Sequence, residues 1–445
     1  MLTSDQNRKI NEIVEEFKEA ADFYRMEYSE DLMGMFRDFG CMLLLKCKVD
    51  TEGKADLERL LEGRHKLKGT VKRQLMTVSE ELAQLWAPGE QDGSGDTGEY
   101  EGSQNVREMF QTALEEIFHF CLYSKGGKNR YLLPEETAKP LLRLLTFPEG
   151  MMAGNEGLVV LDTQCGAGSA LMAASRYLKN LRLMGYEKDE EMWAAAVIMS
   201  QLSGLEMELH LEDGARADLY ESCDLVISNP VYGTDTIKDE ELIDQLPGEL
   251  KTVRGRYHME LIRSMQALNF DGKAMLIVPN SFLFANRTES MKVRKWLLQS
   301  YSLEAIISLP EDTFMYSGVR SGVMVFSKPF MSGGWEGHTQ RVLYYNLEKQ
   351  EDKEKQQKEY ERLEEVWSQR RQLLWKMGAL PDKGKNGGKP QRYKGSCKLA
   401  VQQFLVCRCG SDRGGKMEPS AGKLQTGRAD QSGNRGPGSS FAGDA

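Results

Sequence analysis

The sequence has few of the features that mark secreted, disulfide-stapled or membrane-spanning proteins. It contains 8 cysteines in 445 residues, and they follow neither a disulfide-type nor a zinc-type spacing. No run of 18 or more apolar residues occurs, which argues against a spanning helix. The charged start, MLTSDQNRKINEIVEEF, does not resemble a secretory signal. We therefore expect a cytoplasmic protein without membrane contact or a metal site. Four cysteines in apolar surroundings are expected to be reduced core residues: Cys41, Cys47, Cys121 and Cys223.

An excess of basic charge is also missing. Lysine and arginine total 58 against 67 acidic residues, for a net charge of −9, which by itself does not suggest a nucleic-acid binder. The charge is uneven, however, because residues 251–300 contain nine basic and three acidic side chains. This segment is either a solvated face or a surface that follows phosphates.

Composition and periodicity divide the chain into four parts. Residues 1–123 repeat apolar residues at helical intervals, interrupted by a Gly-rich stretch at 88–104 that we expect to be a loop. Residues 124–330 alternate strand and helix patterns. Residues 331–380 form a charged helical extension, which could be a docking element or a plain solvated helix. Residues 381–445 are of low complexity and we expect them to be disordered.

Short apolar runs predict the strands of the second part. They are separated by helical patterns, which is typical of a mostly parallel sheet covered on both faces. The fold class is therefore α/β, a doubly wound, Rossmann-like sheet with a helical N-terminal domain. The predicted strands are LVVLD (158–162), LRLMGYE (181–187), MELHLED (207–213), CDLVISN (223–229), AMLIVPN (274–280), LEAIISLP (303–310) and GVMVFSK (322–328), and RVLYYNLE (341–348) is a candidate for one more.

The first of these strands runs into a glycine turn, LDTQCGAGSAL, with Asp162, Cys165, Gly166 and Gly168. Glycines let the backbone bend sharply and approach a ligand at the start of the following helix. In open α/β sheets such ligands bind beyond the carboxyl ends of the strands. The spacing is neither the GxGxxG of dinucleotide folds nor a phosphate loop, and alone the turn is weak evidence.

Two acids follow at the ends of the next strands. Glu187 can accept hydrogen bonds from ribose hydroxyls, as an acid about 20 residues after the glycine turn does in dinucleotide folds. The third strand ends in Glu212-Asp213, which offers an acid to a purine amino group. A nucleoside site without a phosphate cradle favours S-adenosylmethionine as the cofactor over a nucleotide.

The fourth strand ends in ISNPVY, with Asn229, Pro230 and Tyr232. The Asn229 side chain and the Pro230 carbonyl offer two oxygen acceptors to the protons of an aromatic amino group, which concentrates electron density on its nitrogen. Tyr232 could stack on the flat base. The alternative is an Asn-Pro turn with a surface tyrosine.

These motifs, in this order, resemble the methyltransferases that make N6-methyladenine in DNA. Two downstream segments narrow the resemblance: GKAMLIVPNSFLF (272–284) and VRKWLLQSYSLEAIISLPEDTFMYSGVRSGVMVFSKP (293–329) look like the modification subunit of type I restriction–modification systems. The resemblance implies a class I S-adenosylmethionine-dependent methyltransferase fold. It also implies that Phe314 stacks on a flipped adenine opposite Tyr232, and that specificity and restriction subunits are partners.

The sequence departs from this family at three places, and other functions stay open. Thr163 and Val231 stand where the family usually has proline, and Leu132-Leu133 stand in a segment that normally reads GQFYTP. The alternative to an adenine-N6 DNA methyltransferase is a catalytically degenerate relative that binds DNA or a partner. A methyltransferase acting on glutamine side chains or RNA is a third possibility, disfavoured by the downstream segments.

Overall fold

The computed structural model describes most of the first 378 residues. The described ranges are 2–50, 54–62, 67–86, 97–124, 132–145, 157–233, 235–284, 286, 288–311, 313–314, 319–328 and 342–378. The predicted disordered tail and the first part of the predicted loop, residues 88–96, lie outside them. Within these ranges no helix combines the length and the apolar character needed to cross a membrane.

The N-terminal region is helical, as predicted. Its helices are α1 (Ser4–Glu27), α2 (Met33–Lys46), α3 (Ala55–Glu62), α4 (Gly69–Ala83) and α5 (Thr97–Leu122). Helix α1 begins with a capping box, in which the Thr3 hydroxyl accepts from the Gln6 amide and the Gln6 side chain accepts from the Thr3 amide. One prediction was wrong in part, because α5 begins at Thr97, inside the stretch expected to be a loop.

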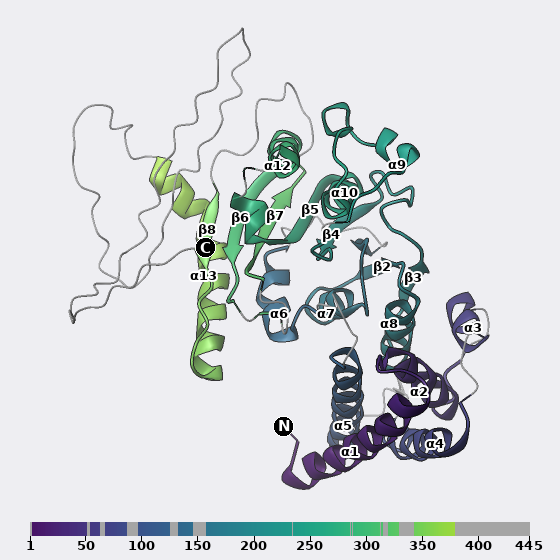
Figure 1. Ribbon diagram of the computed structural model, residues 1–445. Coiled ribbons are helices and arrows are strands. Elements are labelled where there is room, and N and C mark those ends of the chain that lie inside the picture. Colours follow the sequence, from purple (N-terminus) through teal and green to yellow (C-terminus); the bar gives the residue numbers. More distant parts are fainter. Residues whose placement is uncertain are drawn as a thin grey trace, which may run out of the picture. The chain divides into compact units, whose positions relative to one another are not determined.

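The second region is an eight-stranded sheet in the order β3-β2-β1-β4-β5-β7-β6-β8 (Figure 1). Only β7 runs antiparallel to its neighbours, β5 and β6, so the predicted doubly wound, mostly parallel sheet is confirmed. Its strands are β1 (Leu158–Asp162), β2 (Leu181–Glu187), β3 (Met207–Leu211), β4 (Cys223–Ser228), β5 (Leu268–Pro279), β6 (Ser302–Ser308), β7 (Ser321–Ser327) and β8 (Leu343–Asn346).

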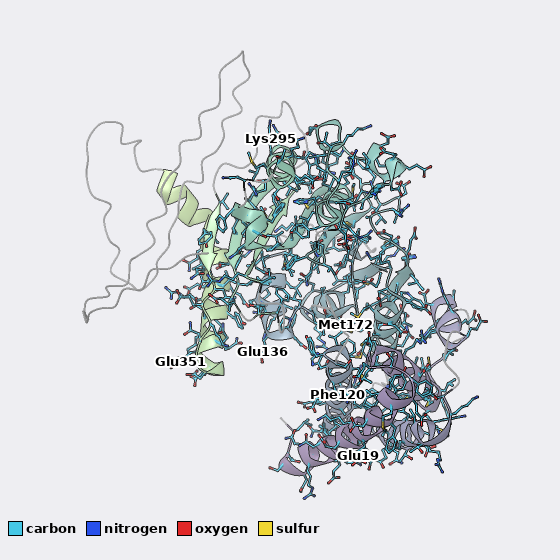
Figure 2. All side chains as sticks on the ribbon, viewed as in Figure 1. Glu19, Phe120, Glu136, Met172, Lys295 and Glu351 are labelled. Atoms are coloured by element: carbon cyan, nitrogen blue, oxygen red, sulfur yellow. The ribbon has the colours of Figure 1, made fainter. Side chains whose placement is uncertain are left out.

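Helices cover both faces of this sheet (Figure 1). One face carries α6 (Glu135–Arg143), α7 (Ser169–Tyr177), α8 (Glu190–Leu202) and α13 (Lys353–Gly378), which share an apolar cluster with the N-terminal helices. The other face carries α9 (Glu240–Asp244), the 3-10 turn η1 (Gly248–Leu250), α10 (Arg256–Gln266) and α12 (Thr288–Ser300). The short α11 (Asn280–Phe284) follows β5 directly. Side chains fill the space between the helices and the sheet (Figure 2).

The strand order places a switch point between β1 and β4. The chain runs outward from β1 through β2 to β3 and returns to β4 on the other side of β1. Loops leaving the carboxyl ends of these two strands therefore diverge, and the crevice between them is where open α/β sheets bind ligands.

The charged segment after residue 346 packs against the sheet domain. Among the side chains of α13 that the structure describes, four are buried: Tyr360, Leu363, Val366 and Trp367. Arg143 of α6 forms an ion pair with Glu364, and the Tyr345 hydroxyl lies 2.9 Å from a Glu359 carboxylate oxygen. Part of the surface that was a candidate docking element is thus occupied by the chain itself.

The basic segment 251–300 does not form one solvated face. Arg263 is 7% exposed and donates to the carbonyls of Ala215 and Ala217, at 2.9 and 2.8 Å. Lys273 is 8% exposed within β5. Lys295 of α12 is exposed (Figure 2). The local excess of charge is therefore divided between structural and surface positions.

The five described cysteines are free and buried, which confirms the reduced core cysteines. Cys165 is free and buried in addition to the four cysteines for which this was predicted.

Candidate active site

A cavity of about 500 Å³ opens at the switch point. It is bordered by the residues that follow β1, β2, β3 and β4 and by the first turns of α8 and α10. Six of the predicted site residues line it: Asp162, Cys165, Gly166, Glu187, Asp213 and Asn229. Four predicted residues are not among its lining: Gly168, Pro230, Tyr232 and Phe314.

The turn after β1 is held by the Asp162 side chain, which accepts from the backbone of the turn. Asp162 is 2% exposed, and its Oδ1 accepts a hydrogen bond from the Gln164 amide at 3.0 Å. Burial raises the pKa of Asp162 to about 7. Gly166 and Gly168 adopt φ values of +55° and +76°, which side chains with a Cβ rarely tolerate. A Cβ on Gly168 would lie 3.0 Å from Met207 Cε, so this glycine permits packing beneath the turn.

Glu187 joins the β1 turn to the end of β2. Its Oε2 accepts from the Gly166 amide at 2.9 Å and its Oε1 from the Asp189 amide at 2.8 Å. Burial raises the pKa of this carboxyl, while the backbone donors act in the opposite direction. Each carboxylate oxygen can accept a second hydrogen bond, so ligand hydroxyls can be bound without breaking these contacts.

Asp213 is engaged by a cation that the sequence did not indicate. Its Oδ1 accepts from the Ala215 amide at 3.2 Å, and its Oδ2 lies 2.8 Å from Arg256 Nη2. The same guanidinium donates through Nε to Glu260 Oε1, also at 2.8 Å. Burial raises the pKa of Glu260 to about 7, against the opposing effect of Arg256. This triad forms one wall of the cavity.

The Asn-Pro-Val-Tyr segment is only partly turned toward the cavity. Asn229 and Val231 line it, whereas Pro230 is buried. The Tyr232 hydroxyl lies 3.3 Å from Ser321 Oγ, and its ring packs edge-on against Tyr257 with centroids 5.7 Å apart. Tyr232 therefore has to turn before it can stack on a ligand in the cavity.

Phe314 lies away from the cavity lining. It is 4% exposed and belongs to the apolar cluster shared with α6 and the N-terminal helices. Tyr232 packs against the cluster on the opposite face of the sheet. In this structure the two aromatic residues expected to enclose a base are not brought together, and the stacking role of Phe314 stays a prediction.

Thr163, one of the departures from the family pattern, lines the cavity and takes part in a polar network there. Its hydroxyl is hydrogen-bonded to Ser264 Oγ and accepts from the Gln164 side chain at 2.6 Å. Gln164 Oε1 in turn accepts from Ser228, the last residue of β4, at 3.5 Å. The network thus ties the β1 turn to the strand that delivers Asn229.

The upstream segment reaches the cavity despite its altered sequence. Leu132 and Leu133 are 9% and 4% exposed and line the cavity. The segment thus contributes apolar surface where the family pattern has a threonine hydroxyl. Tyr131 lies outside the described residues.

The lining carries more acidic than basic side chains. The acids are Asp162, Glu187, Asp189, Asp213, Asp235 and Glu260, and the bases are Lys188 and Arg256. Such a lining favours a cationic ligand over an anionic one.

Sequence reasoning missed the contribution of α10. Arg256, Tyr257 and Glu260 line the cavity, yet they lie more than 20 residues after the Asn-Pro-Val-Tyr motif and belong to none of the recognised motifs. The only local signal was the spacing of Arg256 and Glu260, which places opposite charges one helical turn apart. Nothing in that spacing indicates that the pair faces a ligand site.

Known proteins share this fold. A proposed class I S-adenosylmethionine-dependent methyltransferase from Listeria monocytogenes superposes with a TM-score of 0.58 at 18% identity, covering 81% of this chain and 99% of that one. A methyltransferase subunit of a type I restriction–modification system from Streptococcus thermophilus gives 0.53 at 16% identity, covering 81% and 93%. These similarities confirm the class I methyltransferase fold.

Comparison of sequences identifies the family to which the chain belongs. The methylase subunit of the type I restriction enzyme MjaVII from Methanocaldococcus jannaschii is 24% identical over 298 residues, which are 61% of this chain and 47% of that protein. The chain spans less than half the length of the curated relatives that it matches. The N-6 DNA Methylase family matches residues 107–376, and the chain belongs to that family.

Proposed function

We propose that this chain transfers a methyl group from S-adenosylmethionine to the N6 amino group of adenine in DNA, as a modification subunit that needs a separate specificity partner. The observation that carries the proposal is the acidic cavity at the switch point, which gathers the glycine turn, Glu187, Asp213 and Asn229. The cofactor agrees with the family and with the class I fold. A restriction subunit would be a further partner.

The cavity suits this cofactor by charge. S-adenosylmethionine carries a sulfonium, an ammonium and a carboxylate, and supplies an electrophilic methyl group on the sulfur. Six acidic side chains line the cavity against two basic ones, and an acidic, partly desolvated lining stabilises a net positive ligand. Loss of the sulfonium charge on transfer weakens that attraction, which favours release of the product.

The residues take roles that follow from their positions. The Asp162–Gly168 turn would hold the methionine part of the cofactor, and Glu187 its ribose. Asp213 has lone-pair positions left for the adenine amino group beside its contacts to Arg256 and Ala215. Leu132 and Leu133 would supply apolar contact.

The target amine would be held at the end of β4. The Asn229 side-chain oxygen and the Pro230 carbonyl would accept its two protons and concentrate electron density on its nitrogen. The nitrogen would then take the methyl group that the cofactor supplies, with its bond to sulfur broken, and the surplus amino proton would pass to water. Tyr232, turned toward the cavity, would stack on the flipped base and offset part of the cost of unstacking it.

Two measurements test the proposal. Calorimetry should give a micromolar dissociation constant for S-adenosylmethionine, and the Asp162→Ala variant should lose binding. Transfer of labelled methyl groups to DNA amplified by polymerase, which carries none, should then be lost in Asn229→Ala with cofactor affinity retained. Asn269→Ala is the matched control, because Asn269 donates to Asp224, which is not among the residues lining the cavity.

The same experiments distinguish the proposed enzyme from a catalytically degenerate relative. Absence of cofactor binding at millimolar concentration would refute an autonomous enzyme and favour the degenerate relative. The replaced segment at Leu132-Leu133 is the feature that favours this second reading.

A further inference from the structure

Tyr257, in the first turn of α10, has a buried hydroxyl with no hydrogen-bond partner among the residues that the structure describes. The residue is 7% exposed and lines the cavity. Buried hydroxyls in native proteins are nearly always paired, because an unpaired one has lost water and gained nothing in return. A ligand in the cavity is therefore a candidate for the missing partner.

The ring that carries this hydroxyl is fixed by aromatic neighbours. The ring of Tyr232 packs edge-on against it, with centroids 5.7 Å apart. The ring of Phe282, in α11, also packs edge-on against it, with centroids 5.9 Å apart. The hydroxyl is thus held in place before any ligand arrives. Burial raises the pKa of Tyr257 well above its usual range, so the hydroxyl keeps its proton and can donate.

The chemistry of the target base leaves one requirement unmet. Asn229 and Pro230 provide acceptors for the amino protons of adenine, but the neighbouring ring nitrogens are acceptors and need a donor. We propose that the Tyr257 hydroxyl donates a hydrogen bond to a ring nitrogen of the target base, next to the amino group that Asn229 holds. This inference rests on the proposed function and names a specificity-determining residue for it.

The arrangement discriminates between bases. With N1 as the ring nitrogen, two acceptors beside one donor match adenine, whereas guanine presents a carbonyl and an N1–H at the corresponding positions and mismatches both groups. Cytosine has the same hydrogen-bonding pattern as adenine, an amino group beside a ring-nitrogen acceptor. Tyr257 therefore discriminates against guanine, whereas cytosine has to be excluded by its smaller size. The rings of Tyr232 and Tyr257 are packed together. A rotation of Tyr232 toward the cavity would therefore also uncover part of Tyr257.

The test compares two tyrosines in the full-length chain. Tyr257→Phe removes only the unpaired hydroxyl. Tyr301→Phe is the matched control, because Tyr301 is 3% exposed and its hydroxyl donates to the Met265 carbonyl of α10 at 2.7 Å. For each variant we would measure the urea midpoint of unfolding, the dissociation constant for S-adenosylmethionine, and kcat/KM for methyl transfer to polymerase-amplified DNA.

The expected pattern is opposite in the two variants. Tyr257→Phe should keep or raise the urea midpoint, bind the cofactor as the wild type does, and lose about tenfold or more in kcat/KM for DNA. Tyr301→Phe should lower the midpoint and leave kcat/KM unchanged.

Several results would overturn the inference. A Tyr257→Phe variant with wild-type kcat/KM would show that the hydroxyl does not meet the base. Loss of cofactor affinity would place its partner on the cofactor, and a midpoint lowered as in Tyr301→Phe would show a partner within the protein. A wild-type chain that binds the cofactor but methylates no DNA would refute the proposed function and this inference with it.

Discussion

Arg256 and Asp213, which both line the cavity, form an ion pair in which Arg256 Nη2 and Asp213 Oδ2 are 2.8 Å apart. Their side chains are 21% and 19% exposed. The guanidinium also holds Glu260. A carboxylate that is fixed in this way keeps its remaining lone pairs in a defined direction, which makes Asp213 a preorganised acceptor.

The first prediction concerns this acceptor. Asp213→Asn should weaken S-adenosylmethionine binding about tenfold, because a hydrogen bond to a charged group contributes roughly 1.5–3 kcal/mol and the amide retains part of it. Calorimetry checks the result. Asp244→Asn is the control, since Asp244 pairs with Lys251 on the surface with a side chain that is 75% exposed. Equal affinity in both variants would contradict a role for Asp213 in binding.

The second prediction is a pH dependence of cofactor binding. Asp162 and Glu260 have pKa values raised to about 7. A cationic ligand binds the ionised carboxylates more tightly, so the affinity should rise from pH 6 to about pH 8 and level off above that, by at most about tenfold per pH unit for each group. The slope should be smaller in Asp162→Asn. A flat profile in the wild type would show that neither carboxyl meets the cofactor.

The stability of the free protein should change in the opposite sense. Between pH 4 and 7 the folded chain retains protons on these two carboxyls that the unfolded chain has released. The free energy of unfolding from these groups therefore decreases as the pH rises toward 7. Urea unfolding at several pH values separates this trend from that of cofactor binding.

The third prediction concerns Phe314. Its burial implies that Phe314→Ala lowers the free energy of unfolding by about 3–5 kcal/mol in the absence of DNA. Phe314→Leu keeps most of the volume and should cost less than about 1.5 kcal/mol. A rise in KM for DNA in the leucine variant would show that the ring leaves its cluster to contact the base, whereas an unchanged KM would limit Phe314 to packing.

Much of the fold followed from local sequence. The strands 158–162 and 181–187 were predicted with their observed bounds because each is a short apolar run between turn residues. Strand β5 begins at Leu268, six residues before the predicted start, because its first residues include polar Asn269 and Asp271 and a glycine. The start of β5 is determined by its pairing with β4 and β7, which cannot be read from the sequence of the segment alone.

The candidate site was predictable where chemistry is encoded in a contiguous motif. The β1 turn, Glu187 and Asn229 lie at or directly after strand ends that the hydrophobic pattern reveals. Arg256 and Tyr257 reach the same cavity from a helix that returns after a long connection, so only the tertiary structure brings them there. For Tyr232 and Phe314 the motif predicted a role, but rotamer and packing determine where each ring lies.

The last prediction concerns the contact between the N-terminal helices and the site. Arg37 of α2 is 4% exposed, and its Nη1 lies 3.0 Å from a Glu191 oxygen and 3.4 Å from a Glu190 oxygen. These acids open α8, whose next residue, Met192, lines the cavity. Arg37 therefore fixes the first turn of a helix that borders the cavity.

Removal of this cation should affect both stability and binding. Arg37→Met should lower the free energy of unfolding by roughly 2 kcal/mol, less than for a fully buried pair because the Glu190 side chain is 62% exposed. It should also weaken S-adenosylmethionine binding several-fold as the first turn of α8 loosens. Lys46→Met is the control, since it breaks the surface pair with Glu80 and should cost at most about 1 kcal/mol with unchanged affinity. If the two variants bind the cofactor equally well, the N-terminal helices support the fold without influencing the site.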